Sequence, residues 1–289
     1  MIVNLKEILD IADRQFMAVG AFNVPHLESL RATIGAAEQL NLPVIVQFAQ
    51  VHESWTPIEY MAPVMIKAAS EAKVPVCVHL DHGETLEYVQ KALDLGFTSV
   101  MYDGSVLPFE ENIANTKKAV AMANVHGASV EAELGSMGKR ESGSGDSGGA
   151  DDNAKKVYTD PQQARQFVTE TGITALACSF GTTHGLYKAA PQLNFDIVRD
   201  VRRLADNIPV VMHGGSGVSP EDYRKAVAAG VRKINYFTYM DKAGGTAMAG
   251  YLESLKSDDP KFFTPISLAG LDAMQKNVGE AMKVFALQG

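Results

Sequence analysis

The feature that most constrains this chain is a regular alternation of short β-branched runs with longer helical patterns. Several of the runs are almost continuously apolar, which is typical of parallel strands buried on both faces. The eight predicted strands are Ala18–Val24, Pro43–Ala49, Pro75–His82, Ser99–Asp103, Ser129–Leu134, Ala175–Phe180, Pro209–His213 and Lys233–Thr238. Between them, apolar residues at three- and four-residue spacing predict helices over Leu27–Leu40, Pro57–Lys73, Leu86–Leu95, Phe109–Val125, Pro161–Thr171, Asp196–Ala205 and Pro220–Ala229.

This alternation predicts a parallel (β/α)₈ TIM barrel, with a doubly wound open sheet as the main alternative. Such a barrel needs roughly 250 residues, and the chain has 289, of which 46% are apolar. That apolar content is enough for a full core and excludes a disordered chain. A helix after the last strand closes the barrel, and an extra helix is predicted over Leu268–Phe285. We therefore expect residues 1–289 to form a single domain.

Charge and cysteine content exclude several classes of protein. The net charge of −8 argues against a nucleic-acid partner, because phosphate backbones are bound by clustered lysine and arginine. Two cysteines are too few for a disulfide-stapled secreted scaffold. No stretch reaches the ~20 consecutive apolar residues of a membrane span, and Met1–Asp10 is too polar for a signal peptide. We expect a cytoplasmic protein with no membrane partner.

A glycine- and serine-rich segment from Gly135 to Asn153 interrupts the alternation. It follows a predicted strand, where barrels build their active sites, so an active-site lid is favoured over a plain surface loop. An interdomain linker is disfavoured, because strands and helices continue unchanged beyond the segment. Glu141 lies on it and suits a base that arrives when the lid closes; the alternative is a solvated loop charge.

Three of the seven histidines, His82, His184 and His213, lie at or just after predicted carboxyl ends of strands, and each precedes a glycine. In a barrel these strand ends meet around one mouth. Three neutral imidazoles there can hold Zn²⁺ and leave a fourth position open, as a catalytic zinc site requires. His79 lies in mid-strand and is expected in the core or behind the ligands. The other histidines have no such context: His26, His52 and His126.

Carboxylates accompany these histidines. Asp81 directly precedes His82, where it serves either as an acid or base on the substrate or as a partner that orients a histidine. Asp103 ends a predicted strand, and Glu131 and Glu133 share one face of another. Carboxylates directed into a barrel are costly unless they are paired or linked to a metal.

A phosphate site is predicted after the last two strands. Gly214-Gly215-Ser216-Gly217 runs into the helix that begins near Pro220, and Asn235 to Thr238 end the last strand. Barrels often bind phosphate at these two loops, because small residues and a helix N-terminus expose backbone N–H groups to the anion.

Together these motifs resemble the class II, metal-dependent fructose- and tagatose-bisphosphate aldolases over nearly the whole chain. The matching segments are Ala21-Phe22-Asn23-Val24, His79-Leu80-Asp81-His82-Gly83, Tyr102-Asp103-Gly104-Ser105, Glu131-Ala132-Glu133-Leu134-Gly135, Gly181-Thr182-Thr183-His184-Gly185-Leu186-Tyr187-Lys188 and His213-Gly214-Gly215-Ser216-Gly217. The resemblance implies a lyase that reversibly cleaves a ketose (bis)phosphate to dihydroxyacetone phosphate and an aldehyde, through a metal-stabilised enediolate. It also implies a homodimer or homotetramer acting on a small sugar phosphate.

The resemblance also implies roles for individual residues. His82, His184 and His213 would ligate zinc, with Asp103 and Glu133 near the metal. Asp81 would move the proton of the C4 hydroxyl, and Glu141 would be the base for the donor carbon. A monovalent cation, Na⁺ or K⁺, often lies close to the donor phosphate in this family. Substrate and phosphate contacts are implied for Asn23, Gly185, Lys188, Gly214, Gly215, Ser216, Asn235 and Thr238.

Three departures bear on the substrate. Phe237 replaces a small or acidic residue of the family, and Ala49 stands where many members have serine. The arginine that grips the distal phosphate is missing from Asp259-Pro260-Lys261-Phe262-Phe263, and Lys261 lacks its bidentate fork. The alternatives are therefore an aldolase for ketose 1-phosphates that lack the distal phosphate, and a metal-dependent sugar-phosphate epimerase or isomerase. A non-catalytic sugar-phosphate-binding protein is disfavoured, because the catalytic motifs are intact.

Overall fold

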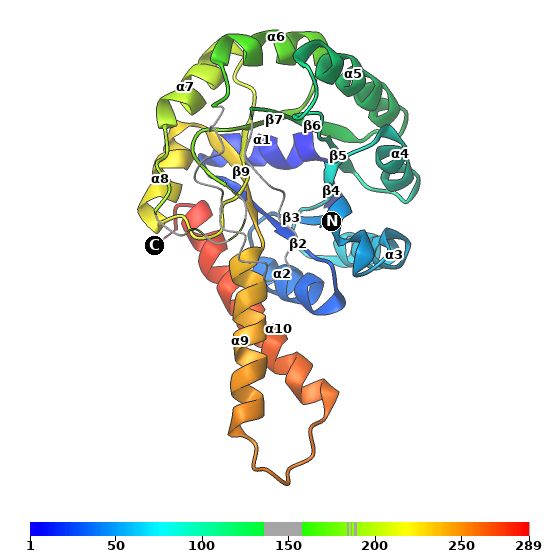
Figure 1. Cartoon of the computed structure of the whole chain (residues 1–289), viewed down its shortest axis with the longest axis vertical. Coiled ribbons are helices and arrows are strands. Elements are labelled where there is room, and N and C mark those ends of the chain that lie inside the picture. Colours follow the sequence, from blue (N-terminus) through cyan, green and yellow to red (C-terminus); the bar gives the residue numbers. More distant parts are fainter. Residues whose placement is uncertain (136–157, 184, 186, 188–189, 289) are drawn as a thin grey trace.

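Eight parallel strands, β2 to β9, close into a barrel with helices around it in the computed structural model of the chain (Figure 1). The structure describes residues 1–135, 158–183, 185, 187 and 190–288. The strand order is β4-β3-β2-β9-β8-β7-β6-β5, and β4 also pairs with β5, which closes the ring. The predicted TIM barrel is confirmed, and the open sheet is wrong because such a sheet would leave β4 and β5 unpaired with each other.

The strands match the predicted ones closely. They are β2 Val19–Asn23, β3 Val44–Ala49, β4 Val76–Gly83, β5 Ser99–Tyr102, β6 Ser129–Leu134, β7 Ala175–Cys178, β8 Val210–Met212 and β9 Val231–Tyr236. The last strand differs most. It ends at Tyr236, and Thr238 begins the next helix, so Thr238 is not a strand residue.

The outer helices also lie where the apolar spacing predicts them. They are α2 Leu27–Leu40, α3 Ile58–Glu71, α4 Leu86–Asp94, α5 Phe109–Val125, α6 Pro161–Thr171, α7 Phe195–Leu204 and α8 Pro220–Ala229. Local chemistry sets their ends. Asp160 accepts hydrogen bonds from the first-turn N–H groups of α6, Pro161 follows at the first position, and Gly172 ends the helix in the left-handed conformation.

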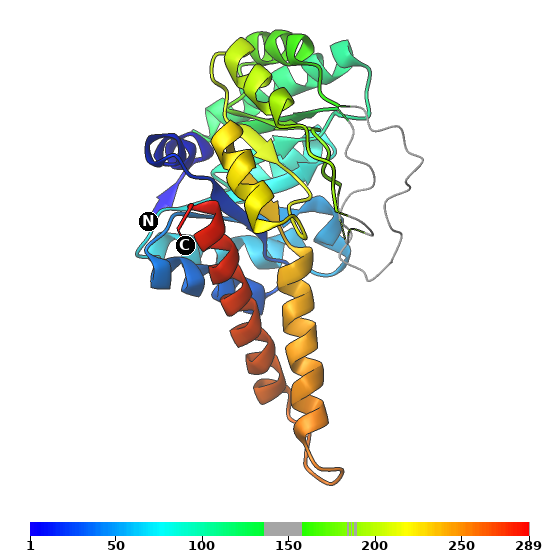
Figure 2. The ribbon, with the colours of Figure 1, turned by 90° about the vertical axis from the view of Figure 1, so that its left-hand side faces the viewer.

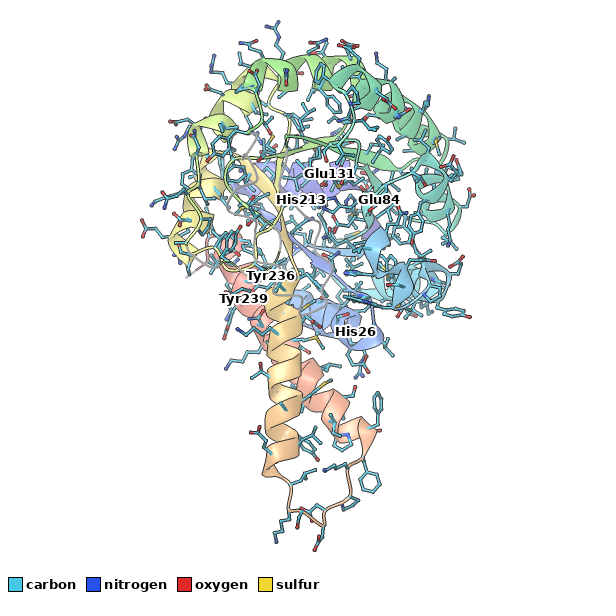
Figure 3. All side chains as sticks on the ribbon, in the orientation of Figure 1. His26, Glu84, Glu131, His213, Tyr236 and Tyr239 are labelled. Atoms are coloured by element: carbon cyan, nitrogen blue, oxygen red, sulfur yellow. The ribbon has the colours of Figure 1, made fainter. Side chains whose placement is uncertain are left out.

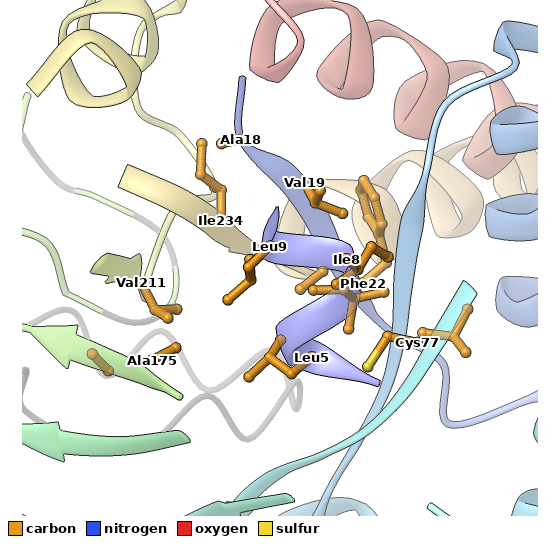
Figure 4. Packing of buried hydrophobic residues seen from close by; sticks show 14 of the residues in the cluster. Leu5, Ile8, Leu9, Ala18, Val19, Phe22, Cys77, Ala175, Val211 and Ile234 are labelled. Carbon is orange, nitrogen blue, oxygen red and sulfur yellow. The ribbon is translucent and has the colours of Figure 1, made fainter. Parts of the chain in front are cut away.

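Two N-terminal elements were not predicted. A short strand, β1 (Ile2–Val3), pairs with β4, and helix α1 (Leu5–Gln15) contacts β2, β4, β6 and β9. Its buried Leu5, Ile8 and Leu9 face the amino-terminal end of the barrel (Figure 4). The capping box of Asn4 and Glu7 was the sequence signal for this helix. α1 thus closes the end of the barrel opposite the mouth.

Helices α9 (Thr238–Ser254) and α10 (Phe263–Phe285) pack together as an arm that projects from the barrel (Figures 1 and 2). The extra C-terminal helix is confirmed, but it begins five residues before the predicted Leu268. Pro265 is accommodated because it lies in the first turn, where its missing N–H is not needed. Lys261 lies in the exposed connection at the tip of the arm. None of the described helices is long and apolar enough to cross a membrane.

Candidate active site

A bulge at the carboxyl end of β4 directs two neighbouring side chains into the barrel mouth. Between β4 and β5 the register shifts, so that Asp81 and His82 together oppose Met101. His82 has a φ of 46°, in the left-handed region that non-glycine residues rarely adopt. Neighbours in a regular strand point to opposite faces, but here His82 Nε2 lies 4.0 Å from Asp81 Oδ1. Gly83 follows the bulge and leaves no room for a side chain, because a Cβ there would lie 2.7 Å from the Met101 carbonyl oxygen.

His82 and His213 face each other across the mouth, with His82 Nε2 3.0 Å from His213 Nδ1. The other nitrogen of each ring meets a carboxylate: His82 Nδ1 lies 2.8 Å from Asp103, and His213 Nε2 lies 2.8 Å from Glu131. Figure 3 shows His213 and Glu131 together in the barrel interior. A carboxylate can only accept, so each outer nitrogen donates and each inner nitrogen presents a lone pair. Facing lone pairs need a proton or a cation between them.

Without a metal, it is a proton on His82 that meets this requirement. Burial alone would lower the pKa of His82, but the carboxylates of Asp81 and Asp103 outweigh it and raise that pKa to about 9. Glu133 adds a carboxylate oxygen 3.5 Å from His213 Nδ1. Two sets of side chains have ligand atoms within 4.8 Å of one another: Asp81, His82 and His213, and His82, Asp103 and Glu133. Paired imidazoles whose outer nitrogens are held by carboxylates are typical of a metal centre.

Two amides clamp the Asp81 carboxylate. Asn23 Nδ2 donates to Oδ2 at 2.9 Å, and Asn235 Nδ2 donates to Oδ1 at 3.0 Å. Gln47 in turn donates to Asn23 Oδ1 at 2.9 Å. Burial would raise the pKa of Asp81, but the positive charges of His82, His213 and Lys233 hold it well below its usual range. Asp81 is therefore ionised and fixed in place.

A buried ion pair lies beneath the histidines. Lys233 Nζ is 2.8 Å from Glu131 Oε2, and both side chains are fully buried. His79 lies beside them, 3.4 Å from Lys233 Nζ, and its other nitrogen is 2.8 Å from Ser99 Oγ. Burial, and next the Lys233 charge, hold the pKa of His79 well below its ordinary value. Lys233 was not among the predicted site residues, although a lysine within an apolar strand was a visible signal.

The ends of β8 and β9 are tied together where the phosphate site is predicted. Gly215 N–H donates to the Asn235 carbonyl at 3.2 Å, and the Phe237 N–H donates to Ser216 Oγ at 3.2 Å. Tyr187 and Tyr223 hydroxyls donate to the Gly214 and Gly215 carbonyls. A Cβ on Gly215 would lie 2.6 Å from the Asn235 carbonyl oxygen, so glycine is required there. Of the other predicted contacts, Gly185 lies between β7 and α7, and Thr238 begins α9.

Three predicted site residues lie outside the described residues: Glu141, His184 and Lys188. The predicted lid beyond Gly135 lies there too. Conversely, His52 was set aside on sequence grounds, yet it is buried at the mouth between Trp55 and Phe237. The missed signal was its position, three residues after the end of β3.

Comparison with known proteins decides the family. The model of the family described as "Fructose-bisphosphate aldolase class-II" matches residues 3–289. The chain belongs to this family. Class II aldolases are metal-dependent lyases that act on sugar phosphates, and the His/Asp/Glu group at the mouth of this chain could hold a metal ion.

Individual relatives agree over most of the chain. It is 36% identical to "Fructose-bisphosphate aldolase" of Staphylococcus aureus (strain Mu50 / ATCC 700699), over 98% of this chain and 97% of the relative. It is 39% identical to the protein named "Probable fructose-bisphosphate aldolase" of Bacillus subtilis (strain 168), over 82% of this chain and 81% of the relative. The crystal structure of the YdjI aldolase from Escherichia coli K12 superimposes with a TM-score of 0.85 at 33% identity, covering 99% of this chain and 97% of that one.

Proposed function

We propose that this class II family member is a zinc-dependent aldolase that reversibly cleaves a ketose phosphate into dihydroxyacetone phosphate and an aldehyde. The observation that carries the proposal is the pair of facing nitrogens, His82 Nε2 and His213 Nδ1, 3.0 Å apart beside the Asp81 carboxylate. These two histidines and His184, from outside the described residues, would hold the metal. Bound there, zinc supplies a Lewis acid that polarises the substrate carbonyl.

Asp81 is proposed to carry the first proton transfer. Its ionised carboxylate, fixed by Asn23 and Asn235, accepts the proton of the hydroxyl whose carbon becomes the aldehyde. As the carbon–carbon bond breaks, its electron pair passes to the donor half, which takes up one proton to become dihydroxyacetone phosphate. We assign that second proton to Glu141.

The donor phosphate is proposed to bind at the joined ends of β8 and β9. Gly214, Gly215 and Ser216 are small residues just before α8, so an anion can come close to the backbone there. The Gly215 N–H is taken up by the Asn235 carbonyl, so the N–H groups of Gly214 and Ser216 are the ones proposed for the phosphate. The tyrosine hydroxyls on the Gly214 and Gly215 carbonyls hold this backbone in one conformation.

The test is Asp81→Asn in the zinc-loaded enzyme. Release of dihydroxyacetone phosphate is followed through NADH oxidation by a coupled glycerol-3-phosphate dehydrogenase, over a panel of ketose mono- and bisphosphates. Removing a positioned acid–base group is expected to lower kcat by about 10²- to 10⁴-fold, while zinc content measured by mass spectrometry stays that of the wild type. Asp94→Asn makes the same chemical change on the exposed end of α4 and should leave the rate unchanged.

A wild-type rate for Asp81→Asn would remove Asp81 from the mechanism. Isomerised ketose phosphate without any triose phosphate, from the wild-type enzyme, would replace the aldolase proposal with the isomerase alternative.

A further inference from the structure

An aromatic cluster stands beside Asp81 at the barrel mouth. The 3₁₀ turn η1 (Gln50–Ser54) follows β3 directly, and the last residue of β3, Ala49, pairs with Asp81 in the sheet. From this turn the ring of His52 stacks on Trp55, with centroids 4.6 Å apart and planes 17° from parallel. Phe237, just after β9, lies 5.1 Å from the same imidazole. η1 and the end of β9 therefore build one wall.

His52 is polar, but it has no polar contact with the residues of this wall that the structure describes. It is 1% exposed, and within the described part of the chain neither ring nitrogen has a hydrogen-bond partner. Burial lowers its pKa to about 4, so at neutral pH the ring is uncharged, with one donor and one acceptor nitrogen. Buried polar groups are nearly always hydrogen-bonded, and the exceptions call for an explanation. One explanation is a bound ligand that both donates and accepts hydrogen bonds.

The chain of side-chain amides around Asp81 also ends in buried oxygen acceptors. Because the carboxylate can only accept, Asn23 and Asn235 must turn their nitrogens towards it. Asn23 Oδ1 then receives the Gln47 nitrogen, which leaves Gln47 Oε1 as the outer end of the chain. Among the described residues, Gln47 Oε1 and Asn235 Oδ1 are buried without a hydrogen-bond partner. Such oxygens suit hydroxyl donors, whereas a phosphate dianion offers only acceptors.

The charges nearby also disfavour a second phosphate. The Asp81 carboxylate lies on the adjoining strand, and Glu53 lies on η1 itself. Lys91, which contacts η1, is paired with both Glu53 and Glu59. Lys261 lies at the far tip of the arm within this chain.

We propose that His52, Trp55 and Phe237 form the subsite for the aldehyde half of the ketose, and that it takes an uncharged, hydroxyl-bearing chain in preference to a phosphorylated one. This inference rests on the proposed aldolase function. The imidazole of His52 hydrogen-bonds a hydroxyl of the chain, and the rings of Trp55 and Phe237 cover its carbon face. Trp55 is half-exposed, so solvent reaches this wall at its indole ring.

The test compares matched substrates on the zinc-loaded enzyme. Each ketose 1-phosphate of a stereochemical series, beginning with fructose, tagatose and sorbose, is paired with its 1,6-bisphosphate, and kcat/KM is measured by release of dihydroxyacetone phosphate. The best monophosphate is expected to exceed its bisphosphate at least about 10-fold. A preference for the bisphosphate throughout the series overturns the inference.

Variants locate the preference in the cluster. His52→Phe keeps an aromatic ring and removes both nitrogens, and it should lower kcat/KM for the monophosphate by about 10-fold. Solvent hydrogen exchange into dihydroxyacetone phosphate needs only the donor half, so it should fall by less than cleavage does. Phe237→Ala should reduce the ratio of monophosphate to bisphosphate activity. His126→Phe makes the same exchange at the opposite end of the barrel and serves as the matched control.

Trp55 gives a readout that is independent of activity. It is the one tryptophan in the sequence, so intrinsic tryptophan fluorescence reports this cluster alone. Titration with unreactive polyols, erythritol and threitol, should shift the emission saturably in the wild type and require higher concentrations in His52→Phe. No shift, or equal titrations of both proteins, overturns the inference. Absence of both hydrogen exchange and cleavage in the wild type would instead count against the proposed aldolase function.

Discussion

The two ends of the barrel differ in the side chains that fill them, which are apolar at one end and polar or charged at the other. At the amino-terminal end, α1 inserts Leu5, Ile8 and Leu9, all at most 1% exposed, among other apolar side chains (Figure 4). At the carboxyl end, His82 and His213 are also buried, but their ring nitrogens face each other 3.0 Å apart beside an ionised Asp81. The closed end stabilises the fold through apolar burial, whereas the mouth holds polar groups that burial destabilises. Stability and chemistry are therefore separable in this chain, and substitutions at the two ends should report on different properties.

The largest effect is expected at the metal site. His213→Ala removes one facing nitrogen and the partner of Glu131 Oε1, so zinc content and cleavage should be lost together. We expect kcat/KM to fall by about 10⁴-fold or more, on the order of 5 kcal/mol in transition-state stabilisation. Zinc analysis by mass spectrometry and the coupled assay check this. Retention of metal and activity would show that His213 is not a ligand.

The buried ion pair tests the layer between the two ends. Lys233→Met leaves the Glu131 carboxylate without its cation in the barrel interior, and the free energy of unfolding should fall by about 3–5 kcal/mol. Urea denaturation measures it. The double variant Glu131→Gln with Lys233→Met removes both charges and should recover part of the loss. A single variant as stable as the wild type would mean that water or a rearrangement solvates Glu131.

The closed end should affect stability alone. Leu9→Ala leaves a cavity between α1 and the barrel and should lower the free energy of unfolding by about 2–5 kcal/mol. Because α1 is at the opposite end from Asp81, kcat at 25 °C should stay within about twofold of the wild type. A large fall in kcat of the folded variant would show that the two ends are coupled.

The smallest expected effect is a pH dependence at the mouth. Burial lowers the pKa of His52 to about 4 from an ordinary 6.5. Between these values the unfolded chain binds a proton that the folded chain does not, so this contribution is complete above about pH 6.5 and is lost as the pH falls towards 4. Its full size is about 3 kcal/mol. His52→Gln should therefore show a shallower loss of stability over this interval, measured by urea denaturation at each pH. Identical slopes would mean that folding does not change the pKa of His52.

Local patterns in the sequence were sufficient for most of the fold. The helices α2, α5, α6 and α8 begin and end at the predicted residues, because caps such as Asp160 and Ser219 act within a few residues. Helix α1 was not predicted, although the capping box of Asn4 and Glu7 at its start is a local signal of the same kind. β9 was placed two residues late because the apolar run continues through Phe237, which packs outside the strand.

The candidate site, like the fold, was predicted in part from local motifs. Motif spacing was enough to name Asp81, His82, Asp103, Glu133 and His213, and the structure brings all five together. Motif spacing alone did not point to Lys233 and His52, because Glu131 and Phe237, which they contact, are far away in the sequence.

By itself, then, the sequence determined the eight strand–helix units, their caps and the histidines and carboxylates at strand ends, because periodicity and capping are local. Only the tertiary structure decided which nitrogens face each other, which amides hold Asp81 and which aromatic rings stand beside it. These depend on barrel closure, on a bulge that turns His82 into the mouth, and on burial that leaves His52 uncharged. The first set places the chain among the metal-dependent aldolases, and the second carries the proposal about its substrate.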